Sequence, residues 1–246
     1  MKRSVKTSVI ITILISMSVL VYLFQIFVFS RPEDTVFYFL EDLGFVPISV
    51  LLVTLGVNTL LTQRDRQATL EKVSIVVNEF YAEAGTELIM GLRGYITNLD
   101  EISGAMQMSG KWTNKDFNAA KAFLASSPVR IDIEGRDIYE LQRLFQEKKD
   151  QILRLFENAN LMEHDSFTDM LWAAYHVYDE LRSRDSLENL PAADTRHLNM
   201  DVERAAGLLM IEWLESMRIL KVKYPYLYSL AVRKCPFAHG KVVIEI

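Results

Sequence analysis

An uncharged apolar run of 22 residues lies near the beginning of the chain. Residues 8–29 read SVIITILISMSVLVYLFQIFVF. At about 1.5 Å of rise per residue, a helix of this length spans about 33 Å, enough to cross a hydrocarbon core of about 30 Å. The run exceeds the roughly 7–15 apolar residues of a signal peptide, and no A-x-A-like cleavage site follows it. We therefore predict a membrane-spanning helix over residues 8–29.

A second uncharged run, residues 45–61 (FVPISVLLVTLGVNTLL), is near the lower length limit for a span. Extending it backwards would place Glu41 and Asp42 inside the membrane, where charges are costly. The segment DTVFYFLEDLG is therefore predicted to form a short interfacial turn or helix. Pro47 would then lie in the first turn of the second span, where its missing N–H costs little. We predict a membrane anchor over residues 1–62.

Basic residues lie on the outer sides of both predicted spans. Three precede the first span (Lys2, Arg3 and Lys6) and three follow the second (Arg64, Arg66 and Lys72), whereas the connection between the spans carries Arg31 against four carboxylates. The positive-inside rule then predicts a multi-pass protein of the cell membrane with both termini in the cytoplasm. Polar residues within the spans, such as Gln25 and Asn58, are typical of helix packing within one chain or across a homo-oligomer, and a pore lining is the alternative.

The charge distribution restricts what the rest of the chain binds. Residues 1–62 contain four basic and four acidic side chains, so the net charge of −5 belongs to residues 63–246. An acidic domain argues against nucleic acid as a partner, because phosphate binding needs a basic face. The single cysteine, Cys235, excludes an intramolecular disulfide, as expected of a cytoplasmic domain.

Residues 63–246 show helical periodicity. Apolar residues recur at spacings of three and four over about 136–161, 166–184 and 194–222, and shorter helices are expected from Thr113 or Asn114 and over YPYLYSLAVR. Residues 131–133 alternate like a strand, but one run without a partner makes no sheet. The predicted fold class is all-α, with two N-terminal transmembrane helices followed by a helical-bundle cytoplasmic domain over residues 63–246.

Three groups of residues could carry chemistry, and none has a specific motif. Glu79, Glu83 and Glu87 form a carboxylate row, which holds metal ions in some bundles together with Glu-x-x-His pairs. No Glu-x-x-His occurs in the sequence, so a solvated helix face is the preferred interpretation.

The second group contains the histidines. His176 and Glu180 are four residues apart, but a histidine beside tyrosines usually packs, and general-base catalysis is the alternative. Cys235 and His239 have C-x3-H spacing, yet a zinc site needs four ligands and no second pair is evident. We recognise no spacing shared by the four histidines, and predict neither a metal site nor a cofactor.

The third group is the most distinctive one. Tyrosines around a proline near the C-terminus either anchor a protein partner or fill the open end of the bundle. The second interpretation is preferred and predicts that Tyr226 and Leu227 are buried. The group comprises Tyr224, Tyr226, Tyr228, Arg233 and Phe237.

The order of two spans, then NEFYAEAGTELI, then KYPYLYSLAVRKCPF resembles a family of uncharacterised two-span prokaryotic membrane proteins. The resemblance covers most of the chain and is carried by Glu83, Gly85, Thr86, Glu87, Leu88 and the segment from Tyr224 to Phe237. Family members have an asparagine where this chain has Cys235, which argues against a general role for the thiol. The family has no assigned activity, so the resemblance implies no catalytic residues.

The biochemical function therefore stays unknown at the level of sequence. The leading hypothesis is a non-enzymatic, membrane-anchored interaction or scaffold protein, whose partners are the lipid bilayer and a protein or a second copy of the chain. One alternative is a small channel or transporter subunit, suggested by the polar residues in the spans. Another is a membrane-tethered enzyme with a carboxylate or histidine site.

Overall fold

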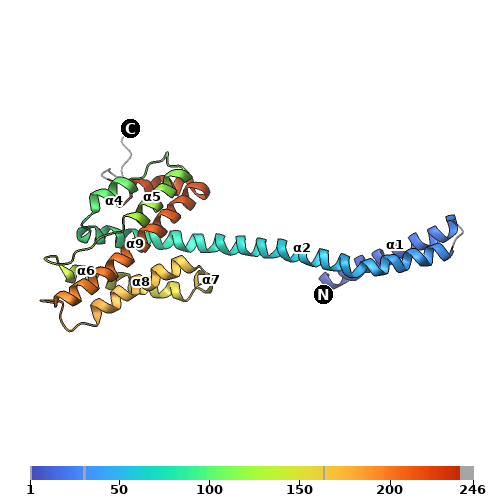
Figure 1. Ribbon diagram of the computed structural model, residues 1–246, viewed down its shortest axis with the longest axis horizontal. Coiled ribbons are helices and arrows are strands. Elements are labelled where there is room, and N and C mark those ends of the chain that lie inside the picture. Colours follow the sequence, from blue (N-terminus) through green and yellow to red (C-terminus); the bar gives the residue numbers. More distant parts are fainter. Residues whose placement is uncertain (1, 30–31, 163, 239–246) are drawn as a thin grey trace. The chain divides into compact units, whose positions relative to one another are not determined.

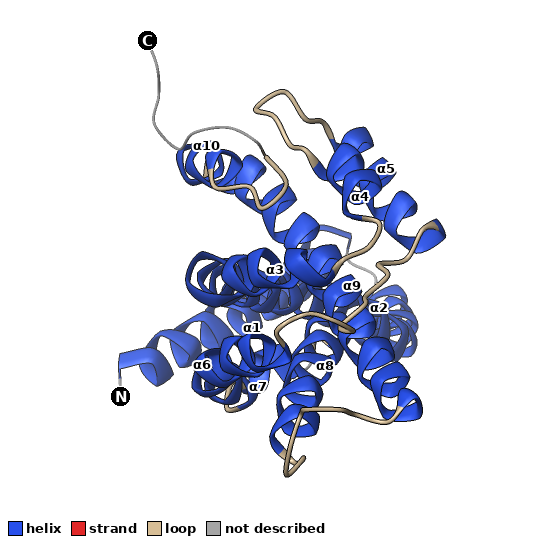
Figure 2. Cartoon of the chain, turned by 90° about the vertical axis from the view of Figure 1, so that its left-hand side faces the viewer, coloured by secondary structure: helices blue, strands red, loops and turns tan. Residues whose placement is uncertain are grey.

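The computed structural model describes residues 2–29, 32–162 and 164–238, and within them it is all-α, as predicted. Figure 2 shows helices joined by loops, with no strand in the described part of the chain. Residues 1–66 and 67–246 form two compact units. The helices are α1 (Lys2–Phe29), α2 (Pro32–Phe80), the π-helix η1 (Tyr81–Gly85), α3 (Thr86–Leu92), the 3-10 helix η2 (Arg93–Tyr95), α4 (Leu99–Met106), α5 (Asn114–Ser126), α6 (Ile138–Phe156), α7 (Ala159–Met162), α8 (Asp165–Arg182), α9 (Ala192–Lys223) and α10 (Pro225–Arg233).

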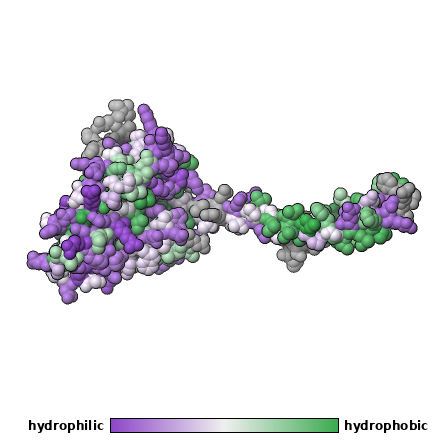
Figure 3. Space-filling view, in the orientation of Figure 1, coloured by the Kyte–Doolittle hydropathy of each residue, from purple (hydrophilic) through white to green (hydrophobic). Residues whose placement is uncertain are grey.

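The first unit consists of α1 and the first part of α2 (Figure 1). Among the described residues one helical segment, Glu33–Arg64, is long and apolar enough to cross a membrane, and Thr12–Val28 is a shorter apolar helix. Tyr22 of α1 donates a hydrogen bond to Asp42 of α2 at 2.9 Å, and its ring packs edge-on against Phe39. Green, hydrophobic residues cover much of this unit in Figure 3.

The beginning of α2 is the helical alternative of the predicted interfacial turn or helix, but it is continuous with the rest of α2 rather than separate from it. Pro32 starts the helix, a position that suits proline, and Glu33 and Asp34 in the first turn interact favourably with the helix dipole. The segment DTVFYFLEDLG is therefore helical, and Pro47 lies inside the helix rather than in its first turn. The uncharged stretch of α2 then runs from residue 43 to residue 63, about 32 Å of helix at 1.5 Å per residue.

The α-helical hydrogen-bonding pattern of α2 changes at η1. A Cβ atom on Gly85 would lie 2.4 Å from Cδ1 of Tyr81 and 2.8 Å from Cε1 of Phe80, so these two buried rings leave room only for glycine. The hydroxyl of Tyr81 donates to the carbonyl of Leu209 in α9 at 2.9 Å. Short π segments within helices are frequent at functional sites.

The second unit is built around α9, which contacts α3, α5, α8 and α10 (Figure 2). The apolar faces predicted for α6, α8 and α9 are the ones that pack: Phe145, Phe167 and Leu209 have no exposed surface. Helix α5 begins at Asn114, one of the two predicted starts, and the other, Thr113, is its N-cap and forms a capping box with Asp116. Ile131 forms an isolated antiparallel bridge with Ile96. The strand-like residues 131–133 therefore pair at one position but form no sheet.

Candidate metal centre

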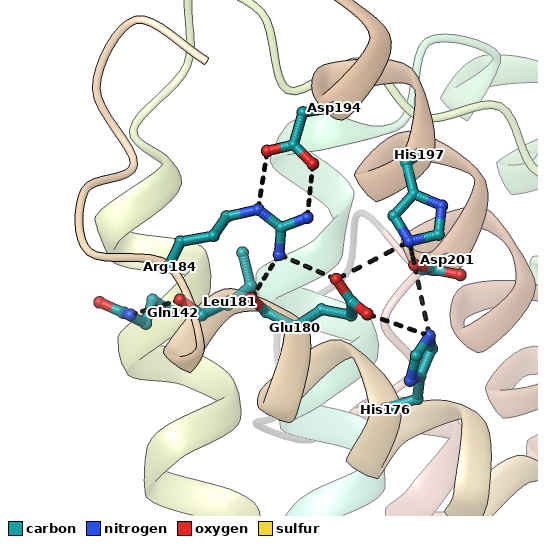
Figure 4. Close-up of polar contacts among 8 residues, drawn as sticks. All are labelled: Gln142, His176, Glu180, Leu181, Arg184, Asp194, His197 and Asp201. Atoms are coloured by element: carbon teal, nitrogen blue, oxygen red, sulfur yellow. Dashed lines mark hydrogen bonds and ion pairs between the residues drawn. The ribbon is translucent and has the colours of Figure 1, made fainter. Parts of the chain in front are cut away.

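Helices α8 and α9 bring two similar residue pairs together (Figure 4). His176 and Glu180 lie one helical turn apart on α8, and His197 and Asp201 lie one turn apart on α9. Residues four apart share a helix face. Because the two helices pack against each other, all four side chains point into the same space.

The distances between the four side chains suit a metal ion. Nε2 of His197 lies 3.3 Å, and Nε2 of His176 lies 3.5 Å, from Oδ2 of Asp201. Each Nε2 lies 3.7 Å from an oxygen of Glu180, and all four ligand atoms lie within 4.8 Å of one another. A tetrahedral ion with N and O ligands at about 2.0–2.2 Å requires ligand separations of about 3.3–3.6 Å. The histidine–carboxylate separations are close to these values, but the two histidines face different oxygens of Glu180, so the side chains must draw together to share one ion.

Asp201 supplies the buried part of the cluster. Its side chain is 14% exposed, and its Oδ2 is shielded from solvent and receives no hydrogen bond. A buried carboxylate oxygen without a donor is unfavourable, and a cation at this position would remove the penalty. The two histidines are about half exposed, so an ion can reach the cluster from solvent.

A second layer of contacts holds Glu180. The guanidinium of Arg184 donates two hydrogen bonds to Asp194, at 2.7 and 2.8 Å, and one to Oε2 of Glu180 at 2.9 Å. The pair with Asp194 raises the pKa of Arg184 and lowers the pKa of Asp194. Gln142 of α6 donates to the carbonyl of Leu181, beside Glu180 (Figure 4). Such outer contacts orient metal ligands in known sites.

This cluster was not predicted from the sequence. The spacing of His176 and Glu180 was recognised there, but the same His-x3-carboxylate spacing in His197 and Asp201 was not. Two His-x3-carboxylate pairs on successive predicted helices were the feature of the sequence from which a shared site could have been predicted. Which helices pack together decides whether the pairs meet, and periodicity within one helix carries no information about that.

The structure keeps the predicted carboxylate row apart from this centre. Glu79, Glu83 and Glu87 are all exposed, and Glu87 is ion-paired with Lys148 of α6. Among the described residues, the potential ligand group contains none of the three. His239, the partner proposed for Cys235, lies outside the described residues. Cys235 itself is buried, and burial raises the pKa of its thiol.

The terminal tyrosine group divides into a packed part and an exposed part. Tyr228 and Phe237 are buried: Tyr228 donates to the carbonyl of Ser109 at 2.9 Å, and burial raises its pKa to about 12. Tyr226 is 72% exposed and Leu227 43% exposed, so the prediction that these two fill the end of the bundle is wrong. The reason is the helical period of α10, which turns Tyr228 towards α9 and its two predecessors away.

Comparisons with known proteins place the chain among uncharacterised relatives. Residues 2–61 match the family described as "MJ1433, N-terminal helical domain", and residues 69–233 match "Uncharacterized protein MJ1433, C-terminal helical domain". The chain is 40% identical to the uncharacterized protein MJ1433 of Methanocaldococcus jannaschii over 233 residues, 94% of this chain and 93% of the relative. No solved structure matches the chain. The chain therefore belongs to the MJ1433 family, whose function is uncharacterised.

Proposed function

We propose that the chain is a two-span membrane protein whose helical domain lies in the cytoplasm and binds one zinc ion between α8 and α9. The observation that carries the proposal is the convergence of His176, Glu180, His197 and Asp201, with histidine–carboxylate separations of 3.3–3.7 Å and all ligand atoms within 4.8 Å of one another. The protein acts without catalysis, as a membrane-anchored interaction or scaffold protein. Its partners are the bilayer and another protein or a second copy, and not nucleic acid.

Zinc suits the cluster better than magnesium or calcium does. Imidazole and carboxylate ligands together favour zinc and its neighbours over magnesium and calcium, which prefer oxygen alone. Four protein ligands complete a tetrahedral shell and leave no open position for water or substrate, as in structural zinc sites. The ion would tie α8 to α9, the two helices that carry its ligands. This closed shell favours the non-enzymatic role over the membrane-tethered enzyme.

Exposed apolar surface supports the membrane anchor. Phe24 is 66%, Leu52 61% and Val53 64% exposed, and water alone would solvate such a surface poorly. Lipid, or the spans of a second copy, would cover it. The uncharged stretches of α1 and α2 each have the length of a hydrocarbon core, which supports two spans.

The proposed topology predicts opposite labelling of two engineered cysteines in a Cys235→Ser background. In intact cells an impermeant thiol reagent should label Glu33→Cys, outside the membrane, and should label the exposed Met200→Cys only after permeabilisation. Cys235 is a poor reporter because it is buried. Labelling of Met200→Cys in intact cells would reverse the topology.

Zinc titration of the purified full chain tests the metal proposal. Protein in non-ionic detergent is stripped with a chelator and then incubated with zinc. After gel filtration it should retain one zinc per chain. At free zinc of 100 times Kd, binding stabilises the folded state by about 2.7 kcal/mol. The melting temperature should therefore rise by about 5–11 °C, at roughly 2–4 °C per kcal/mol for a domain of this size. Magnesium is the control and should change nothing; an equal shift with magnesium, or no retained zinc, contradicts the proposal.

A further inference from the structure

A second candidate site lies in the helical domain, apart from the proposed zinc ligands. A cavity of about 890 Å³ opens between the end of α2, η1, α3 and α10, with Trp213 and Met217 of α9 among its lining residues. We call it the terminal groove. It brings Glu79 and Glu87 together with Tyr224, Tyr226 and Arg233, from two groups that the sequence kept separate. None of the four proposed zinc ligands lines it.

The lining of the groove is largely apolar and open to solvent. Ile75 is 50%, Met90 52%, Leu227 43% and Leu230 39% exposed. An apolar concavity of this size is in the range of small-molecule sites, about 300–1,000 Å³. An apolar chain lying in it would remove these side chains from water.

Two residues that line the groove each carry a buried hydrogen-bond donor for which the described residues offer no acceptor. Arg233 donates from Nη1 to Ser229 at 3.0 Å, but its Nε is shielded from solvent and unbonded. Asn78 accepts a hydrogen bond from Ser216 at 2.6 Å, and its Nδ2 is unbonded. Unbonded buried donors are rare because they forgo hydrogen bonds to water. A group bound in the groove would reach either donor once its side chain shifts.

The charges around the groove favour an anion. Arg93, Arg233 and Lys234 line it, and no ion pair is found for any of the three among the described residues. Of the two lining carboxylates, Glu87 is already neutralised by Lys148, which leaves Glu79. An anionic group near Arg233 would pair with its guanidinium and offset the excess positive charge.

We propose that the terminal groove binds a free, single-chain amphiphile with an anionic head, such as a long-chain carboxylate. The apolar lining takes the chain, and Arg233, assisted by Lys234 and Arg93, takes the head. A neutral amphiphile would leave the charge of Arg233 without a partner, and an anion without a chain would leave the apolar lining in water. Both halves of the ligand are therefore required.

Fluorescence quenching measures this binding directly, because Trp213 lines the groove. The full chain carrying Trp112→Phe and Trp172→Phe keeps Trp213 as its only tryptophan. It is placed in nanodiscs of zwitterionic lipid and titrated with dibromostearate, whose bromine atoms quench nearby indoles. Quenching should saturate, whereas the methyl ester of the same acid, which lacks the charge, should quench weakly and without saturation.

Charge variants assign the binding to the groove. Arg233→Gln should raise the half-saturating dibromostearate concentration about tenfold, from the loss of a charge-assisted hydrogen bond. Lys234 is exposed, so Lys234→Gln cannot disturb folding and should give a smaller rise. Arg204→Gln, an exposed arginine of α9 that does not line the groove, is the matched control and should change nothing. Melting curves establish that each variant is folded.

Three outcomes would overturn the proposal. Equal quenching by acid and ester, or an Arg204→Gln effect as large as that of Arg233→Gln, would mean partitioning into the bilayer. Saturable quenching by a brominated anionic phospholipid in the disc, with none by the free acid, would assign the groove to membrane lipid. Dimerisation that depends on Arg233, without quenching, would assign it to a second copy. Zinc binding is unaffected in every case, so the two proposals fail independently.

Discussion

Asp201→Ala and His197→Ala are each expected to abolish stoichiometric zinc binding. Loss even of an outer contact to a ligand lowers metal affinity about 10–100-fold, and loss of a ligand itself lowers it further. Arg184→Ala, which frees Glu180, should therefore weaken binding by about 10–100-fold. Zinc retained after gel filtration and the zinc-induced rise in melting temperature are the two measurements. Asp169→Ala, an exposed carboxylate on α8, is the control and should bind zinc as the parent does.

The zinc-free variants separate a ligand from an ordinary structural residue. Oδ2 of Asp201 is buried and receives no hydrogen bond from the described residues, and the two histidines 3.3 and 3.5 Å away form ion pairs with it only when they are protonated. At a pH high enough to keep both histidines neutral, Asp201→Ala should therefore lose the response to zinc without lowering the melting temperature of the zinc-free protein. A lower melting temperature of zinc-free Asp201→Ala, together with an unchanged response to zinc, would show that Asp201 is a packing residue and would contradict the metal proposal.

Phe237→Ala is expected to destabilise the helical domain by about 3–5 kcal/mol. The side chain has no exposed surface, and its ring packs edge-on against Trp213 at 5.8 Å between centroids. At roughly 2–4 °C per kcal/mol for a domain of this size, the melting temperature should fall by about 6–20 °C. Thermal melting of the full chain, followed by circular dichroism at a helical wavelength, measures the effect.

Tyr226→Ala is the matched control for Phe237→Ala. Both residues belong to the same terminal group, but Tyr226 is 72% exposed. Its truncation should change the free energy of unfolding by no more than about 0.5 kcal/mol, as surface substitutions usually do. Equal losses for the two variants would mean that Tyr226 is packed against something in the native protein.

The sequence by itself determined the helical class and most of the helix faces. Apolar periodicity is a local property, so the stripes of α6, α8 and α9 could be identified before their partners were known, and residues such as Phe145 and Leu209 are buried as predicted. The long uncharged runs likewise depend only on residue type. Helix boundaries were less certain, because Pro32 and the acidic residues after it start α2 ahead of the predicted second span.

Only the tertiary structure decided which separate signals meet. His176 and Glu180 lie on α8, and His197 and Asp201 lie on α9; each pair alone resembles a solvated helix face. The packing of α8 against α9 makes them one cluster, just as the packing of α3 and α10 against α9 places Arg233 and Glu87 in one groove. The helical period defines which side chains share a face of one helix. The pairing of helices depends on the summed burial of many side chains far apart in sequence, and no single pattern reports it.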